Sequence, residues 1–101
     1  MQAFLVPQVH SATTVVATGA SEANTAIPNN ASGEKTAYLM LRTEPGEWCK
    51  VLPIASGTPA GSTFMPVTEH GVILNVKGMA SIRHIEGSTG ANLYLTPLEN
   101  Q

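Results

Sequence analysis

The sequence predicts an all-β protein: a single antiparallel β-sandwich or small jelly roll with seven to eight short strands. Two observations lead to this prediction. Nowhere does an apolar period of 3.6 residues persist for ten residues, so no amphipathic helix is expected. Short runs rich in Val, Ile, Leu, Thr and Tyr recur at spacings of about ten residues, bounded by Gly, Pro and Asn. The chain has 101 residues, which is the length of one domain.

The first half of the chain contains two expected strands with a loop between them. Ala12–Thr18 forms the first strand, which ends at Gly19. Pro28–Lys35 is expected to be a loop, because Asn and Gly tolerate the positive φ angles that turns require. Thr36–Thr43 is rich in residues that favour strands and is the clearest strand of the sequence.

Turn residues predict how the second half folds. Glu44–Glu47 has Pro followed by Gly, which suit the two central positions of a tight turn. Trp48–Ile54 is therefore expected to return antiparallel to Thr36–Thr43 as a hairpin. Two more strand pairs are expected around His70-Gly71 and around the Gly87–Gly90 loop. Their ranges are Ser62–Glu69 with Val72–Gly78, and Ala80–Glu86 with Ala91–Pro97.

Alternation along the strands assigns apolar residues to the core. Successive side chains of a strand point to opposite faces, so residues two apart share a face. The expected core residues are Ala37, Leu39, Leu41, Val72, Leu74, Val76, Leu93 and Leu95. Each buried Leu or Val contributes roughly 1.5–3 kcal/mol to stability.

The charge content argues against several classes of partner. The net charge is −2, with five Lys and Arg residues in total, so there is no basic patch for nucleic acid or for an anionic membrane. No segment approaches the roughly 20 apolar residues of a membrane span, and the N-terminal sequence lacks the basic region of a signal peptide. Only 12% of the residues are charged, and such a surface is suited to packing against other proteins.

A metal site is not expected. His84 and Glu86 lie two apart on one strand and would share a face as a solvated pair. A metal site in proteins usually needs three or four ligands. His10, His70 and Cys49, the other candidates, lie in separate segments without ligand spacing.

Nucleophilic catalysis is not expected either. The "GSTG" loop is not the G-x-S-x-G elbow of serine hydrolases. Cys49 lies between Trp48 and Lys50 in a strand and is expected to pack as a small apolar residue, although a nearby base could make its thiol reactive. We therefore expect no enzyme, and no catalytic, cofactor-binding or metal-binding residues.

Two parts of the sequence contain candidate residues for a partner interface. Residues 1–11 are expected to form an extended arm before a β-sandwich domain at 12–101. The apolar residues Phe4, Leu5 and Val6 in this arm would need a partner to cover them. Tyr38 and Trp48, neighbours across the predicted hairpin, could stack on sugars or anchor a protein interface; alternatively they cover the sheet beside the turn.

From about Thr36 to Pro97 the sequence resembles small β proteins from the structural operons of tailed bacteriophages. The resemblance rests on "AYLMLRT", on "SGTPAGSTFMPV", on Ile82 with Ile85, and on the final "GSTGANLYLTP". Arg83 and His84 depart from the small residues expected between the two isoleucines, and they are added to the candidate partner contacts.

The resemblance implies a virion protein: a capsid decoration (cement) protein on the outer surface of the major capsid protein lattice. It further implies a homo-oligomer, with a trimer favoured, no cofactor, and synthesis in the host cytoplasm before assembly on the capsid surface. A head–tail connector or tail-fibre component of the same particle is the structural alternative. A carbohydrate-binding module, with Tyr38 and Trp48 as its stacking platform, is the alternative from another class.

Overall fold

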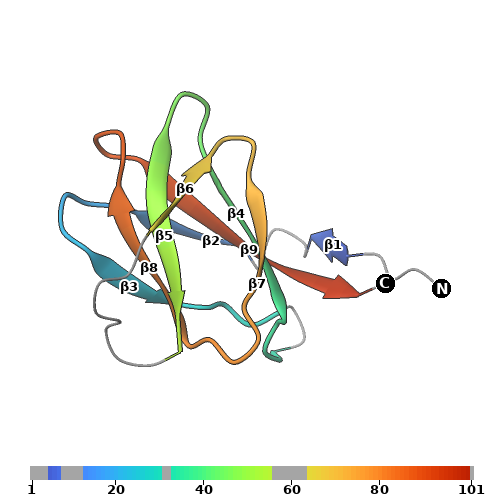
Figure 1. Cartoon of the computed structure of the whole chain (residues 1–101). Helices are drawn as coiled ribbons and strands as arrows, with labels where there is room; N and C mark the ends of the chain where they lie inside the picture. The colour runs from blue at the N-terminus through green and yellow to red at the C-terminus, as the bar shows by residue number, and fades with distance from the viewer. Residues whose placement is uncertain (1–4, 8–12, 31–32, 56–63, 101) are drawn as a thin grey trace.

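The computed structural model describes residues 5–7, 13–30, 33–55 and 64–100, and describes side chains for those between 13 and 98. These residues form nine β-strands and no helix (Figure 1). The strands are β1 (Leu5–Pro7), β2 (Thr14–Ala17), β3 (Ala23–Ala26), β4 (Tyr38–Thr43), β5 (Trp48–Ile54), β6 (Met65–Thr68), β7 (Val72–Asn75), β8 (Ser81–Glu86) and β9 (Asn92–Asn100). Among the described residues, none belongs to a helix long and apolar enough to cross a membrane.

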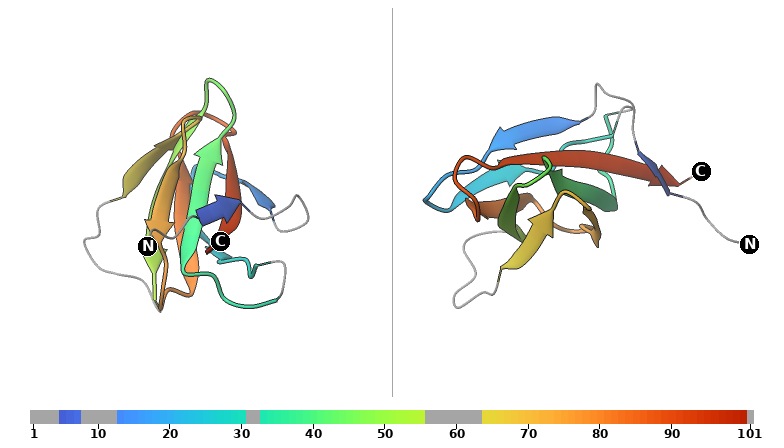
Figure 2. Two further views of the ribbon diagram at one scale, coloured as in Figure 1. Left: turned by 90° about the vertical axis from the view of Figure 1, so that its right-hand side faces the viewer. Right: turned by 90° about the horizontal axis from the view of Figure 1, so that it is seen from above.

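The strands form two antiparallel sheets packed as a sandwich (Figure 2). Sheet A has the order β2-β9-β4-β7, and β1 pairs with the far end of β9. Sheet B has the order β3-β8-β5-β6. Eight strands arranged in these two orders make a jelly roll, the double-sheet fold built from two Greek keys. The predicted fold class is therefore confirmed, with β1 as a short addition to the eight strands.

The strand pairing corrects three expected hairpins. Strand β4 belongs to sheet A and β5 to sheet B, so the turn at Glu44–Glu47 carries the chain from one sheet to the other. The turn at His70-Gly71 and the loop at Gly87–Gly90 also connect strands of different sheets. Among the strands that the structure describes, β5 and β6 are the only consecutive pair that is hydrogen-bonded together.

The turns themselves have the predicted geometry. The Glu47 N–H donates to the Glu44 carbonyl at 3.0 Å, which closes the turn. Gly46 has φ of 81°, in the left-handed region that favours glycine. The Gly71 N–H likewise donates to the Thr68 carbonyl at 3.1 Å. The turn residues therefore predicted correctly where the chain turns, but they did not predict which sheet the following strand joins.

The core lies between the two sheets and is mostly apolar, although Thr43 and His84 are also buried. The expected core residues pack there, fully or partly buried, except Ala37, which precedes β4 and is exposed. Sheet B contributes buried residues that alternate with half-buried or exposed residues along its strands. The central members are Leu39, Leu41, Leu93 and Leu95 from sheet A, and Cys49, Val51, Val67 and Ile82 from sheet B.

Strand β9 is the longest strand, with nine residues, and it reaches beyond its neighbours (Figure 2). Strand β1 pairs with this protruding end through three residue pairs, from Leu5 with Asn100 to Pro7 with Leu98. Part of the expected arm at 1–11 is thus a strand of the chain's own sheet, and the rest of that arm lies outside the described residues. Residues 13–98 contain the eight jelly-roll strands apart from the end of β9.

Candidate interaction surfaces

The structure does not bring the seven candidate interface residues together. Phe4 lies outside the described residues, whereas Leu5 and Val6 belong to β1. Tyr38 in β4 points away from the core on sheet A, since its neighbour Leu39 is buried. Trp48 in β5 points away from the core on sheet B, on the opposite side of the sandwich.

This separation corrects the idea of a shared aromatic platform. Tyr38 and Trp48 were expected to be neighbours across a hairpin, but their strands lie in different sheets. One planar ligand cannot stack on both rings at once. The structure therefore removes the feature on which the carbohydrate-binding alternative depended.

The outward face of sheet A exposes two large apolar side chains. Val15 is 54% exposed on β2 and Ile73 is 53% exposed on β7. The register places Val15 opposite Tyr94, and Ile73 opposite Met40. Both exposed residues lie on the same face, because their strand neighbours on either side pack toward the core. We call this surface, made of Val15, Met40, Arg42, Ile73 and Tyr94, the sheet A face.

A polar cluster holds the middle of this face in place. The Arg42 guanidinium lies 4.5 Å from the centre of the Tyr94 ring, a cation–π distance. The Tyr94 hydroxyl donates to Glu44 Oε1 at 3.0 Å, and this hydrogen bond is the main cause that raises the pKa of Tyr94. The one cation on the face therefore lies against an aromatic ring whose hydroxyl is held by a carboxylate.

Trp48 is held firmly on the other side of the sandwich. Its carbonyl accepts hydrogen bonds from the N–H groups of Gly87 and Ser88, at 3.1 and 2.9 Å. Its own N–H donates to Ser88 Oγ at 3.0 Å. The indole is 41% exposed, and the Lys50 ammonium lies 6.0 Å from its centre. The backbone of Trp48 is thus firmly bonded, and its indole remains partly open to solvent.

Arg83 and His84 point to opposite sides of β8. Arg83 faces outward, where its Nε lies 3.5 Å from Glu22 Oε1, and its side chain is only 16% exposed. His84 faces the core, is 2% exposed, and has its Nε2 2.8 Å from Thr25 Oγ1. The expected solvated pair of His84 and Glu86 is therefore wrong, because His84 is buried in the sandwich.

Burial also determines the protonation state of His84 and Cys49 by shifting their pKa values. Loss of solvent around His84 lowers its pKa below 6.5, so the ring is neutral at neutral pH. Its Nδ1 is buried without a hydrogen-bond partner among the described residues. Burial raises the pKa of the Cys49 thiol to about 11, and Cys49 is fully buried. The expectation that Cys49 packs as an apolar residue is confirmed.

No set of three His, Cys, Asp or Glu side chains within the described ranges is placed to hold a metal ion. Desolvation accounts for the raised pKa of the Cys49 thiol, and no base among the described residues counteracts it.

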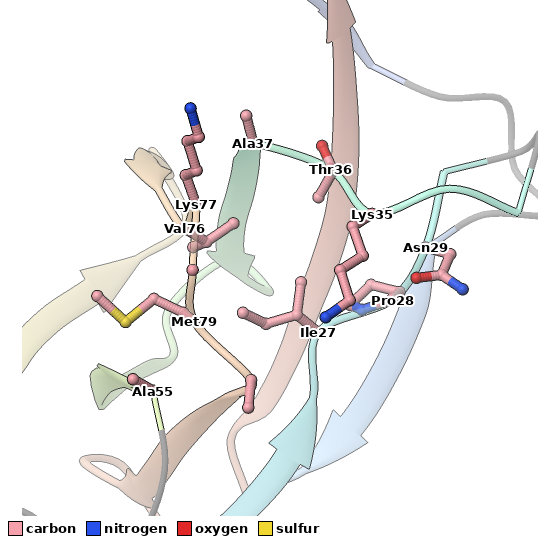
Figure 3. A pocket seen from close by; sticks show the side chains of 12 residues that line it. Ile27, Pro28, Asn29, Lys35, Thr36, Ala37, Ala55, Val76, Lys77 and Met79 are labelled. Atoms are coloured by element: carbon pink, nitrogen blue, oxygen red, sulfur yellow. The ribbon is translucent and has the colours of Figure 1, made fainter.

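One end of the sandwich contains a pocket of about 570 Å³ (Figure 3). It opens where the segment after β3, the end of β5 and the turn between β7 and β8 meet. Its lining residues are Ile27, Pro28, Asn29, Lys35, Thr36, Ala37, Ala55, Val76, Lys77, Gly78, Met79 and Ala80. We call it the end pocket. Sequence reasoning missed it, because its walls come from three loops whose proximity only the fold establishes.

Backbone hydrogen bonds fix the walls of the end pocket. The Val76 N–H donates to the Ala37 carbonyl at 2.8 Å, and the Ala80 N–H donates to the Ile54 carbonyl at 2.9 Å. These two bonds tie the turn between β7 and β8 to both sheets. Gly78 in this turn has φ of 80°, a conformation that other residues rarely adopt. The pocket is therefore formed by an ordered frame.

The comparisons with known proteins find no match: no protein-family model, no curated protein sequence and no solved structure is significantly similar to this chain.

Proposed function

We propose that the protein is a non-enzymatic structural component of a virus particle. In this proposal it is a capsid decoration protein that binds the outer surface of the major capsid protein lattice and stabilises the head. The observation that carries the proposal is the sheet A face, where Val15 on β2 and Ile73 on β7 are exposed on either side of the Arg42–Tyr94 pair. Large apolar side chains that share one exposed sheet face are available for contact with another protein.

Three further features support this proposal. The jelly roll is a fold used by viral capsid proteins, although lectins and cupins share it. Few residues of the chain are charged, as expected of a protein whose surface packs against other proteins in an assembly. The resemblance of the sequence to phage structural proteins points to the same class of particle. By this proposal the protein acts as a homo-oligomer, with a trimer favoured.

The proposal is tested with capsids of the encoding virus that lack this protein. The purified chain is expected to co-sediment with them at a fixed, stoichiometric copy number. It should also raise their melting temperature in calorimetry, because a ligand that binds only the assembled state stabilises it. Capsids that neither retain the protein nor gain stability would contradict the proposal.

A surface variant locates the contact on the sheet A face. Replacing Val15→Thr and Ile73→Thr together keeps β-branched residues in both strands while removing apolar surface. A buried methylene contributes about 0.8 kcal/mol, so capsid affinity is expected to fall about tenfold or more. Asn24→Thr, at an exposed position of β3 on the other sheet, serves as the matched control and should leave affinity unchanged.

A further inference from the structure

We propose that the end pocket binds an acidic segment of a partner protein: a Glu or Asp side chain with apolar residues on either side. This inference builds on the proposed function, since it specifies the chemistry of a partner segment. It concerns a part of the molecule separate from the sheet A face. The pocket lies at the end of the sandwich, between loops, whereas the sheet A face lies on the outer side of β2, β9, β4 and β7.

The charge of the pocket favours an anion. The chain has five Lys and Arg residues and a net charge of −2, yet two of these five cations, Lys35 and Lys77, line this one pocket. Among the lining residues no carboxylate is present to neutralise them. Both lysines are exposed, so their ammonium groups are available to a ligand. A carboxylate that enters the pocket would meet positive charge without displacing an internal ion pair.

The remaining lining residues favour an apolar neighbour of that anion. Ile27 and Met79 are half-buried and pack against the core cluster, so they offer an apolar floor rather than an independent polar site. Figure 3 shows Lys77 and Met79 on one side of the pocket and Lys35 and Pro28 on the other, with Ile27 between them. In this view the Lys35 ammonium lies next to Ile27, whereas the Lys77 side chain extends away from Ile27 and Met79, so a ligand that contacts both ammonium groups requires the exposed Lys77 side chain to turn toward it.

The size and order of the pocket suit a short peptide segment. Its volume of about 570 Å³ lies within the range of ligand pockets and exceeds what a simple inorganic anion fills. The loop that carries Lys35 is closed by two backbone bonds: Asn30 N–H donates to the Glu34 carbonyl at 2.8 Å, and Gly33 N–H donates to the Asn30 carbonyl at 2.9 Å. Lys77 follows Asn75, whose Oδ1 accepts from the Lys77 N–H at 3.0 Å. Both lysines are thus anchored at their backbones before a ligand arrives, which lowers the entropy lost on binding.

The test is an NMR titration of the full, isotope-labelled chain with the capped peptide acetyl-Ala-Leu-Glu-Leu-Ala-amide. We expect saturable shifts of the amide signals from Val76 to Ala80. A twin peptide with Gln in place of Glu should bind more weakly by about two- to fivefold, the range that an exposed ion pair provides. Lys35→Gln and Lys77→Gln should each weaken binding of the Glu peptide to a similar extent. Lys50→Gln, beside Trp48 on sheet B, is the matched control and should leave the affinity unchanged.

The outcomes separate this inference from the proposed function. No saturable shift, equal affinity for the Glu and Gln peptides, or shifts confined to other parts of the chain would overturn the inference. Equal displacement of the peptide by inorganic phosphate at similar concentration would also overturn it, because the apolar flanks would then contribute nothing. If the peptide binds as expected but the protein does not bind capsids, the pocket stands and the capsid proposal fails. If the protein binds capsids but the double variant Lys35→Gln, Lys77→Gln changes neither the capsid affinity nor the peptide affinity, the capsid proposal stands and the pocket inference fails.

Discussion

The indole of Trp48 lies directly against the backbone of Gly87, at a position where any side chain would overlap the ring. A Cβ atom added at Gly87 would collide with three carbon atoms of the indole. The two residues are also joined by the hydrogen bond from the Gly87 N–H to the Trp48 carbonyl. Gly87 has no unusual backbone angle, so glycine is needed here for space rather than for conformation.

Gly87→Ala is therefore expected to displace the indole and destabilise the protein. Forcing extra volume into a packed contact costs about 1–3 kcal/mol. We expect a lower midpoint of urea unfolding and a red shift of the Trp48 fluorescence, since the ring loses cover. Trp48 is the only tryptophan of the chain, so the signal is unambiguous.

Gly19→Ala is the matched control for this change. A Cβ atom at Gly19 would meet nothing within 4 Å, and its backbone does not occupy the left-handed region. The same substitution there should leave stability and fluorescence nearly unchanged. Equal effects of the two variants would mean that the contact with Trp48 does not explain the need for Gly87.

The thiol of Cys49 is expected to be protected while the protein is folded. Cys49 is fully buried, and burial raises the pKa of its thiol to about 11, so neither access nor the thiolate form favours reaction at pH 8. An aromatic disulfide reagent should react with the chain slowly in buffer and rapidly in urea. Fast reaction of the native protein at pH 8 would show that this part of the sandwich opens readily.

His84 is expected to make the protein less stable in mild acid. Burial lowers the pKa of the folded protein's His84 below the unfolded value of 6.5. Below pH 6.5 the unfolded chain gains a proton that the folded chain does not. The free energy of unfolding should therefore fall as the pH drops below 6.5, and this contribution should level off below the folded pKa.

The variant His84→Gln isolates this contribution, because Gln does not titrate and retains a group that can bond to Thr25. The difference in unfolding free energy between the parent and the variant should change between pH 7.5 and pH 5, in favour of the variant at the acid end. A constant difference over that range would show that His84 takes up its proton equally in both states. Groups whose surroundings are the same in both proteins contribute equally to the two pH profiles and cancel in the difference.

The local pattern of the sequence predicted most strands and the inward residues along them. Alternation identified the buried Leu39, Leu41, Leu93 and Leu95, since burial of one sheet face leaves a period of two in the sequence. Strand β3 escaped prediction because its sequence, Ala-Asn-Thr-Ala, lacks large apolar or aromatic residues. Strand β1 fell within the segment expected to be an arm.

Strand pairing could not be predicted in the same way. A turn with Pro45 and Gly46 reverses the chain whether the following strand returns to the same sheet or crosses to the other one. The consequence was greatest for the candidate site, because Tyr38 and Trp48 lie on opposite sides of the sandwich. The burial of His84 was missed for a related reason: its partner Thr25 lies 59 residues away, on a strand that the sequence did not reveal.

Deletion of Met1–Val9 is expected to leave a folded domain with weakened assembly. Strand β1 contributes three residue pairs to the end of β9, whereas the eight jelly-roll strands pair without it. The truncated chain should keep a cooperative unfolding transition, with the β-type circular dichroism spectrum of the parent. Its capsid binding or oligomerisation should fall if this segment contacts neighbouring subunits in the particle. An unfolded product would show that the segment completes the core, and unchanged assembly would show that it serves only its own sheet.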